Sequence, residues 1–219
     1  MTHLALHGLH RLVLAFCVVG LLLVRDGCDD EPDDGAPEDA RVVVIDAGHG
    51  GNDPGTLGGV APTAPEKDIT LAISAQVATL LESQGVRVVL SRDSDVFVEL
   101  DDRAALARRH QAGLFVSIHA DAAENADASG ATLYIRPDGD AASRRAADAI
   151  VSTFRLASIK CRGTARAEFR VLVGHKRPAV LVECGYLTNA DDARNLNDPH
   201  YQRTIAAAIA EGIIVFLAD

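Results

Sequence analysis

The sequence contains few cysteines, and no two of them are closely spaced. The four cysteines are Cys17, Cys28, Cys161 and Cys184. This wide spacing excludes both a small disulfide-rich domain and a zinc knot built on paired cysteines. Cys184 lies in an apolar stretch and is interpreted as a small buried hydrophobe, while a disulfide between Cys161 and Cys184 stays open. A chain of 219 residues, 48% of them hydrophobic, can bury one sizeable core, so we expect one globular domain with a tail.

Positive charge is also in short supply. The formal net charge is -10, and no stripe of lysine and arginine marks a surface for nucleic acid, so we expect no nucleic-acid partner. The negative charge is concentrated between residues 29 and 39, where proline and glycine accompany a run of acidic residues: Asp29, Asp30, Glu31, Asp33, Asp34, Glu38 and Asp39. This composition predicts an acidic disordered linker over residues 29–40.

The amino-terminal segment lacks the length of an ordinary membrane span. Its apolar run covers residues 12–24 and follows Arg11, whereas a spanning helix needs about 20 residues. Residues 1–28 are therefore predicted to be a signal peptide or membrane anchor, which implies export to the periplasm or the extracellular cell envelope. An uncleaved anchor and a buried helix remain alternatives, because no small-x-small cleavage site is clear.

Cys28 follows this apolar run closely and resembles the lipid-attachment cysteine of bacterial lipoproteins. The residues before it, 24–27, depart from the apolar and small residues of that motif. Membrane attachment through the N-terminal segment or through a lipidated Cys28 therefore stays open.

From residue 41 onward, short apolar runs alternate with helical repeats. The runs are rich in β-branched residues, as buried strands are, and they cover residues 42–45, 86–90, 114–118, 132–135, 169–173 and 179–182. The helical repeats predict helices over about residues 65–85, 100–111 and 141–154, and from Tyr201 onward. This alternation predicts an α/β domain over residues 41–219, with a single sheet covered by helices on both faces.

Four polar residues stand close to the ends of these predicted elements. His49 lies just beyond the first strand, His119 and Glu183 directly follow the third and the last, and Glu66 opens the first helix. Because the C-terminal ends of parallel strands form one rim of an α/β sheet, we expect these residues to converge there. Two imidazoles and a carboxylate are a known donor set for catalytic zinc, which leaves a fourth position for water.

Each of these residues also has an ordinary structural interpretation. A histidine after a strand is often merely hydrogen-bonded, and a glutamate that opens a helix favours the helix dipole. Glu183, however, lies in the apolar run 179–184, where an unpaired charge is costly to bury. The glycines of residues 46–51 permit positive φ and close backbone approach around His49. A phosphate-binding loop is excluded there, because the G-x-G-x-x-G spacing and the P-loop lysine are both missing.

Together, four segments resemble the motifs of the zinc-dependent N-acetylmuramoyl-L-alanine amidase family. Residues 44–51, Val-Ile-Asp-Ala-Gly-His-Gly-Gly, resemble its first zinc-ligand motif, and residues 66–72 resemble the segment that supplies its glutamate ligand. Residues 117–122 resemble its second histidine motif, and residues 178–189 resemble the motif that holds its catalytic glutamate. The resemblance covers residues 41–217.

The resemblance implies one zinc ion (Zn2+) per chain, with His49, Glu66 and His119 as metal ligands and Glu183 as the catalytic acid/base residue. It also implies a single mixed six-stranded sheet with flanking helices. One departure from the family is Asp121, which stands where the family commonly has asparagine.

Three further residues are interpreted structurally. Arg92 and Arg103 match positions that are often basic in the family, and we expect them to form salt bridges. His175 precedes the last predicted strand, and we expect a solvated loop histidine there. No substrate-binding residue is assigned from the sequence.

The activity implied by the resemblance is zinc-dependent hydrolysis of the amide bond between N-acetylmuramic acid and L-alanine in peptidoglycan, which releases stem peptides from glycan strands. Peptidoglycan is thus the expected partner, the chain is expected to be a monomer, and the need for an activator protein stays open. Two alternatives remain: another zinc hydrolase of an envelope substrate, such as a peptidase or deacetylase, and a non-catalytic envelope-binding protein. The complete set of four residues argues against the second, since a decayed site would be free to lose at least one.

Overall fold

The computed structural model describes residues 42–57 and 64–219, so the predicted signal segment 1–28 and linker 29–40 lie outside the described residues. The strands are β1 (Val42–Ala47), β2 (Arg87–Leu90), β3 (Leu114–Asp121), β4 (Ala131–Ile135), β5 (Cys161–Arg166) and β6 (Ala179–Tyr186). The helices are α1 (Glu66–Ser83), α2 (Leu100–Arg109), α3 (Ala141–Leu156), α4 (Arg170–Val173), α5 (Ala190–Leu196) and α6 (Pro199–Ala218).

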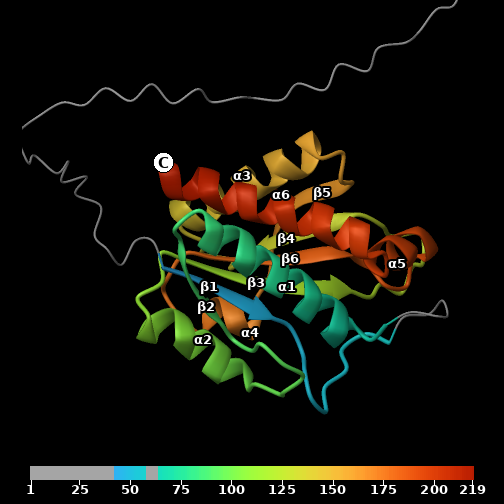
Figure 1. The fold of residues 1–219 in the computed structure, drawn as a ribbon, viewed down its shortest axis with the longest axis horizontal. Helices are drawn as coiled ribbons and strands as arrows, with labels where there is room; N and C mark the ends of the chain where they lie inside the picture. Colours follow the sequence, from blue (N-terminus) through green and yellow to red (C-terminus); the bar gives the residue numbers. More distant parts are fainter. Residues whose placement is uncertain (1–41, 58–63) are drawn as a thin grey trace, which may run out of the picture. The chain divides into compact units, whose positions relative to one another are not determined.

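The strands form one sheet in the order β2-β1-β3-β6-β4-β5 (Figure 1). β1 pairs in parallel with β2 and β3, β3 with β6, and β4 with β5, whereas β4 and β6 run antiparallel. The predicted single mixed six-stranded sheet is therefore confirmed. Since β1, β3 and β6 are parallel neighbours, their C-terminal ends meet at one edge of the sheet.

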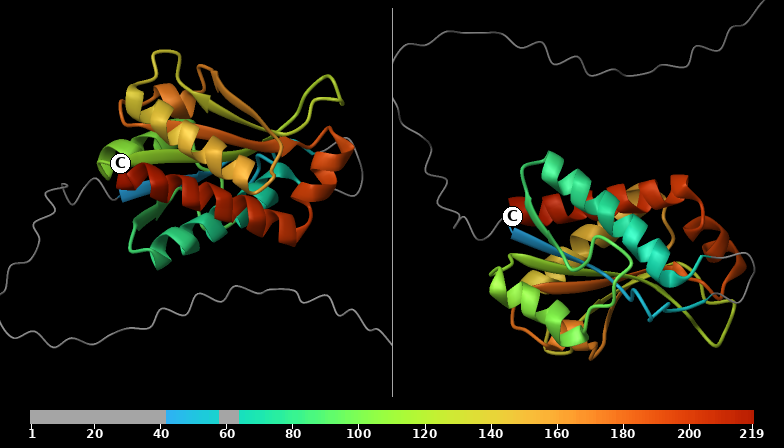
Figure 2. Two further views of the ribbon diagram at one scale, coloured as in Figure 1. Left: turned by 90° about the horizontal axis from the view of Figure 1, so that it is seen from above. Right: turned by 60° about the horizontal axis from the view of Figure 1, so that its bottom comes forward.

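Alternate residues of the central strands contribute to two separate cores. Val43 and Ile45 of β1 pack into a cluster with residues of α1, α3 and α6, and Val44 packs on the opposite face with residues of α2 and α4. The ribbon views show the same division, with α1 and α6 on one side of the sheet and α2 with α4 on the other (Figures 1 and 2). Burial on both faces explains why these strands read as continuous apolar runs.

The long helix α6 contributes to the larger of the two cores, together with α1 and α3. By length and composition it could cross a membrane, since its most apolar window has a mean hydropathy of 1.3. However, Ile205, Ile209 and Ile213 are fully buried, and the helix packs against α1 and α3. Apolar residues at this spacing form the buried stripe of a core helix.

One predicted strand is wrong, and one observed strand was not predicted. Residues 169–173, predicted as a strand, contain the single-turn helix α4. The strand that completes the sheet is instead β5, which was not among the predicted strands. A short apolar run does not separate a strand from a buried turn of helix. Val171 and Leu172 are buried side by side while Phe169 and Val173 are partly exposed, which is not the alternation of a strand. β5, with the sequence Cys-Arg-Gly-Thr-Ala-Arg, has too little apolar content to predict a strand.

The other predicted elements are confirmed with shifted ends. α1 begins at Glu66, as expected, and β3 and β6 run beyond their predicted ends to Asp121 and Tyr186. The short helix α5 has no counterpart among the predicted elements. Cys161 and Cys184 are both free, and Cys184 is buried, as its apolar surroundings predicted.

His175 is buried, so the expectation of a solvated histidine is wrong. His175 is only 4% exposed. Its ring packs edge-on against Phe115, with the ring centroids 5.0 Å apart. Nδ1 accepts a hydrogen bond from the backbone N–H of Arg177. Burial lowers the pKa of His175 to about 4, and the positive charges of Arg136 and Arg108 add to this effect. The turn before β6 therefore packs onto β3 rather than projecting into solvent.

Candidate metal centre and catalytic cleft

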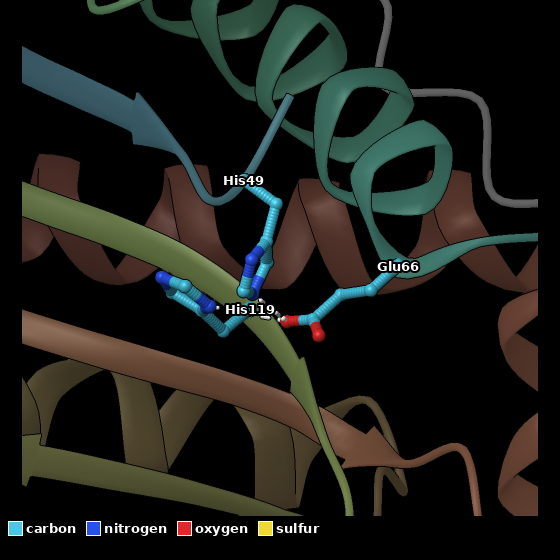
Figure 3. Close-up of side chains that lie close together, drawn as sticks. All are labelled: His49, Glu66 and His119. Atoms are coloured by element: carbon cyan, nitrogen blue, oxygen red, sulfur yellow. Dashed lines mark hydrogen bonds and ion pairs between the residues drawn. The ribbon is translucent and has the colours of Figure 1, made fainter. Parts of the chain in front are cut away.

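Three side chains from distant parts of the sequence converge at the C-terminal edge of the sheet. His49 lies in the turn after β1, Glu66 is the first residue of α1, and His119 lies in β3 (Figure 3). Glu66 Oε1 is 3.1 Å from His49 Nε2 and 3.1 Å from His119 Nδ1. We call these three residues the His-Glu-His cluster.

The spacing of the donor atoms in this cluster fits a metal ion. One ligand atom from each residue lies within 4.8 Å of the other two. Ligands about 2.0–2.1 Å from a tetrahedral metal stand about 3.3 Å apart, close to the two distances of 3.1 Å in the cluster. The donor set and its geometry therefore agree with the metal site expected from the sequence.

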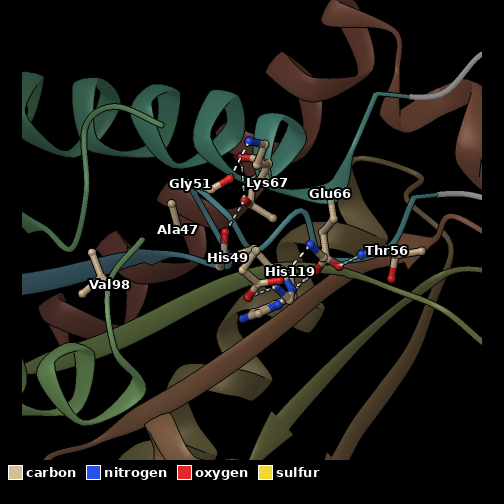
Figure 4. Close-up of polar contacts among 12 residues, drawn as sticks. Ala47, His49, Gly51, Thr56, Glu66, Lys67, Val98 and His119 are labelled. Carbon is tan, nitrogen blue, oxygen red and sulfur yellow. Dashed lines mark hydrogen bonds and ion pairs between the residues drawn. The ribbon is translucent and has the colours of Figure 1, made fainter. Parts of the chain in front are cut away.

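Glu66 is held in place through both of its carboxylate oxygens. Oε2 accepts a hydrogen bond from the Thr56 N–H at 2.9 Å (Figure 4). Oε1 accepts one from the Ala120 N–H at 2.9 Å. Burial alone would raise the pKa of this carboxyl, but hydrogen bonds and charge interactions with His119 and His49 hold it well below its usual range. Glu66 is therefore ionised, as a carboxylate ligand must be.

Asp53 orients the ring of His49. Its Oδ2 lies 2.8 Å from His49 Nδ1, which leaves Nε2 facing Glu66. Burial acts to lower the pKa of His49, but Glu66 and Asp53 outweigh it and raise this pKa above its ordinary value. A carboxylate on the second ring nitrogen is a usual support of a metal-binding histidine. Asp53 was not singled out from the sequence, although it lies four residues after His49 in the same glycine-rich segment.

Two buried arginines hold the backbone that carries His49. Arg92 and Arg103 together donate hydrogen bonds to three consecutive carbonyl oxygens, those of residues 47–49. The salt bridge expected for Arg103 is confirmed by its contact of 2.7 Å with Asp46. The one expected for Arg92 is wrong, because its partners among the described residues are backbone carbonyls and the Thr70 hydroxyl. These bonds satisfy backbone carbonyls at the end of β1 and in the turn that follows it.

Gly48 brings this turn against the ring of His119. A Cβ atom on Gly48 would lie 2.4 Å from Cε1 of that ring, which is closer than side chains pack. The next residue, His49, has a φ of 59°, which is uncommon for a residue other than glycine. The close approach expected of the glycine-rich segment is thus present, and the centroids of the two imidazole rings lie 4.9 Å apart.

Glu183 faces the same edge of the sheet from β6. It lies within the strand rather than after it, directly opposite His119 in the pairing of β3 with β6. Glu183 is 6% exposed, and its Oε2 has no hydrogen-bond partner among the described residues. Burial raises the pKa of Glu183 well above the ordinary value, and the charges of Asp121 and Glu66 raise it further. A buried carboxyl with a raised pKa at the edge of a sheet is a candidate for proton transfer.

The four predicted residues line one cleft of about 520 Å³. Part of its wall comes from α2 and from the segment of α4, and consists of Leu100, Phe169, Arg170 and Val171. The ring of Phe169 packs edge-on against Tyr134 at a centroid distance of 5.2 Å. This wall is not predictable from the sequence, because the apolar run 169–173 indicates a strand and its exposed side chains carry no metal-binding pattern.

Comparison with known proteins agrees with this geometry. The family model of N-acetylmuramoyl-L-alanine amidases matches residues 43–215. The chain is 38% identical over 202 residues to the uncharacterized protein YqiI of Bacillus subtilis, covering 91% of this chain and 94% of the relative. It is 32% identical over 221 residues to the N-acetylmuramoyl-L-alanine amidase AmiA of Escherichia coli, covering 80% of this chain and 76% of the relative.

A solved structure shows the same architecture. The N-acetylmuramoyl-L-alanine amidase AmiC2 of Nostoc punctiforme superposes with a TM-score of 0.74 at 42% sequence identity, covering 81% of this chain and 97% of that one. At 42% identity, the similarity supports membership of the same family as well as the same fold. Sequence motifs, sheet order and site geometry lead to one conclusion: the chain belongs to the N-acetylmuramoyl-L-alanine amidase family.

Proposed function

We propose that this chain is a zinc-dependent amidase that hydrolyses the bond between N-acetylmuramic acid and L-alanine in peptidoglycan. His49, Glu66 and His119 would hold the zinc, and Glu183 would act as general acid and base. The observation that carries the proposal is the placement of the buried Glu183 carboxyl, whose Oε2 has no hydrogen-bond partner among the described residues, in the same cleft as three donors at metal-ligand spacing. Two imidazoles with one carboxylate suit zinc better than calcium or magnesium, which prefer oxygen ligands.

Each residue of the site has a defined part in this reaction. When bound, zinc supplies Lewis-acid chemistry, in that it polarises the scissile carbonyl and makes water more acidic. Glu183 takes a proton from the attacking water and gives it to the nitrogen of L-alanine as the carbon–nitrogen bond breaks. The products are a carboxylate on the lactyl group of the sugar and a stem peptide with a free amino terminus.

The surroundings of Glu183 suit this proton transfer. A general base works best with a pKa near the pH of the reaction, and burial moves the pKa of Glu183 upward from the ordinary value. A dication in the His-Glu-His cluster would oppose that shift by offsetting the negative charge of Glu66. Asp53 keeps the ring of His49 turned toward the cluster through its contact of 2.8 Å with Nδ1.

The roles of the two glutamates can be separated by substitution. Glu183→Gln should lower the rate of stem-peptide release from purified sacculi at least about 10²-fold, while the zinc content stays at one per chain. Glu66→Gln should lower zinc affinity itself, because a neutral amide is a poorer zinc donor than a carboxylate. The control is Glu211→Gln, which changes an exposed glutamate on α6. Normal turnover in Glu183→Gln, or loss of its zinc while Glu66→Gln keeps zinc, would contradict these roles.

Product analysis separates the amidase from its alternatives. Mass spectrometry of digested sacculi should find a new amino terminus on L-alanine with sugar and peptide each intact. A peptidase would cut within the stem peptide, a deacetylase would release acetate, and a non-catalytic binding protein would leave the sacculi unchanged. Any of these three outcomes would refute the proposed reaction.

The predicted location follows from the substrate and from the amino-terminal segment. Because peptidoglycan lies outside the cytoplasmic membrane, residues 1–28 would direct the chain to the cell envelope, with residues 29–40 as a spacer before the domain. Fractionation of cells that express the full chain tests this, and activity confined to the cytosol would refute it. Cys28→Ser should move the protein from membrane to soluble fraction only if Cys28 carries a lipid. Light scattering of the purified domain tests the expected monomer.

A further inference from the structure

The charges that line the catalytic cleft are unevenly distributed. The lining residues include four carboxylates, those of Asp53, Glu66, Asp121 and Glu183. Among the residues that the structure describes around the cleft, Arg170 is the only lysine or arginine. With zinc in the His-Glu-His cluster, as proposed, Arg170 would supply the positive side-chain charge on the α4 wall, away from the metal, to an anionic group of the substrate.

The guanidinium of Arg170 is oriented but not fully used. Its Nε donates to Asp101 Oδ1 at 2.5 Å, and both side chains are more than half exposed. Its two terminal nitrogens have no hydrogen-bond partner within the described part of the chain. An exposed ion pair of this kind stabilises a protein little, but it orients a guanidinium that can donate two parallel hydrogen bonds to a carboxylate.

The size of the cleft sets which part of a substrate Arg170 can reach. A roughly round cavity of 520 Å³ is about 10 Å across, and two residues of extended peptide span about 7 Å. A stem peptide whose first residue is at the His-Glu-His cluster would extend its second residue across most of this width, and the wall of this cleft includes Arg170. In peptidoglycan that second residue is D-glutamate joined through its side-chain carboxyl, so its α-carboxyl group is either free or amidated.

We infer that Arg170 is a specificity-determining residue that binds the free α-carboxylate of the second stem-peptide residue, so that the chain prefers stem peptides in which this group is not amidated. The inference rests on the proposed function and narrows its substrate. Phe169 and Leu100, which are partly exposed beside Arg170 in the same wall, provide apolar contact for the carbon chain between the two amides.

A pair of substrates that differ only in this group tests the inference. The substrates are two disaccharide peptides with L-alanine followed by D-glutamate, one with the α-carboxylate free and one with it amidated. For the zinc-loaded wild type, kcat/KM should favour the free acid on the order of 10-fold, as expected for a charge-assisted pair that is partly exposed to water. Arg170→Met should bring this ratio to about one by slowing only the free acid, and Arg170→Lys should keep part of the preference.

A matched control distinguishes binding from a general effect of lost charge. Arg194 is also an exposed arginine with one aspartate partner, at 2.9 Å, but lies on α5 outside the cleft lining. Arg194→Met should keep the wild-type ratio. Equal wild-type rates on both substrates, or an undiminished preference in Arg170→Met, would overturn the assignment of Arg170 while leaving the amidase reaction intact. Failure of the wild type to cleave either substrate would instead overturn the proposed function, and the inference with it.

Discussion

Replacing Gly48 with alanine should weaken metal binding by displacing His119. The added Cβ would lie 2.4 Å from Cε1 of the His119 ring, where ordinary van der Waals contact is 3.4–4 Å. The ring must therefore move by at least about 1 Å, several times the tolerance of about 0.2 Å on a metal–ligand distance. The cluster would lose one of its three ligands or hold it in a distorted position.

The expected result is a loss of zinc affinity of about 10-fold to 100-fold, the range seen when ligand positioning is disturbed. Competition with a chromophoric chelator measures this affinity directly, and thermal melting of the metal-free proteins measures the separate effect on folding. Overpacking of this kind typically costs about 1–3 kcal/mol. Release of stem peptides should fall with zinc occupancy.

Gly212→Ala is the matched control for this experiment. Its Cβ would lie 2.6 Å from the Cα of Ile150 where α6 packs on α3, so it should lower the melting temperature without changing zinc affinity. If Gly48→Ala bound zinc as tightly as the wild type, the distance between Gly48 and His119 would not control the metal site, and the reasoning would fail.

Three further predictions concern stability. Zinc should raise the melting temperature and a chelator should lower it, with about 2.7 kcal/mol gained at 100 times the dissociation constant. The gain should shrink at acid pH, because metal ligands must be deprotonated to bind. The pKa of His175 is about 4 in the folded protein, so between pH 4 and the ordinary histidine pKa the unfolded chain binds more protons than the folded one. The free energy of unfolding should therefore fall as the pH drops through this window. His175→Asn should flatten this fall in urea titrations followed by circular dichroism. Arg103→Met leaves Asp46 buried without its cation, and should lower the free energy of unfolding by about 3–5 kcal/mol in the same titrations. Arg103→Lys should lower it less. Equal values for the wild type and the two variants would contradict this.

The central fold and the His-Glu-His cluster were predictable because their signals are local. β1, β3 and β6 are buried on both faces, so each appears as a continuous apolar run. His49, His119 and Glu183 stand at the ends of those runs, and a parallel sheet brings such ends together. The sequence motifs then restricted the chemistry to one family.

Other features depend on contacts that the sequence does not record. Arg92 was expected to pair with a carboxylate, yet it binds backbone carbonyls, which look the same at every position of a sequence. His175 is buried by the packing of a turn onto Phe115, a contact between residues far apart in the chain. Arg170 lines the cleft only because residues 170–173 form a helical turn instead of a strand.

The polar edge strand β5 also affects how the molecule behaves in concentrated solution. An unpaired strand edge is a template on which a second chain can add a strand. At this edge Arg162 and Arg166 are exposed, Gly163 has a φ of 95°, and the pairing with β4 shifts register between Ala131 and Leu133. Charge and irregular backbone both oppose edge-to-edge association. The polar composition that makes β5 hard to predict from the sequence thus also disfavours edge-to-edge pairing at this edge of the sheet.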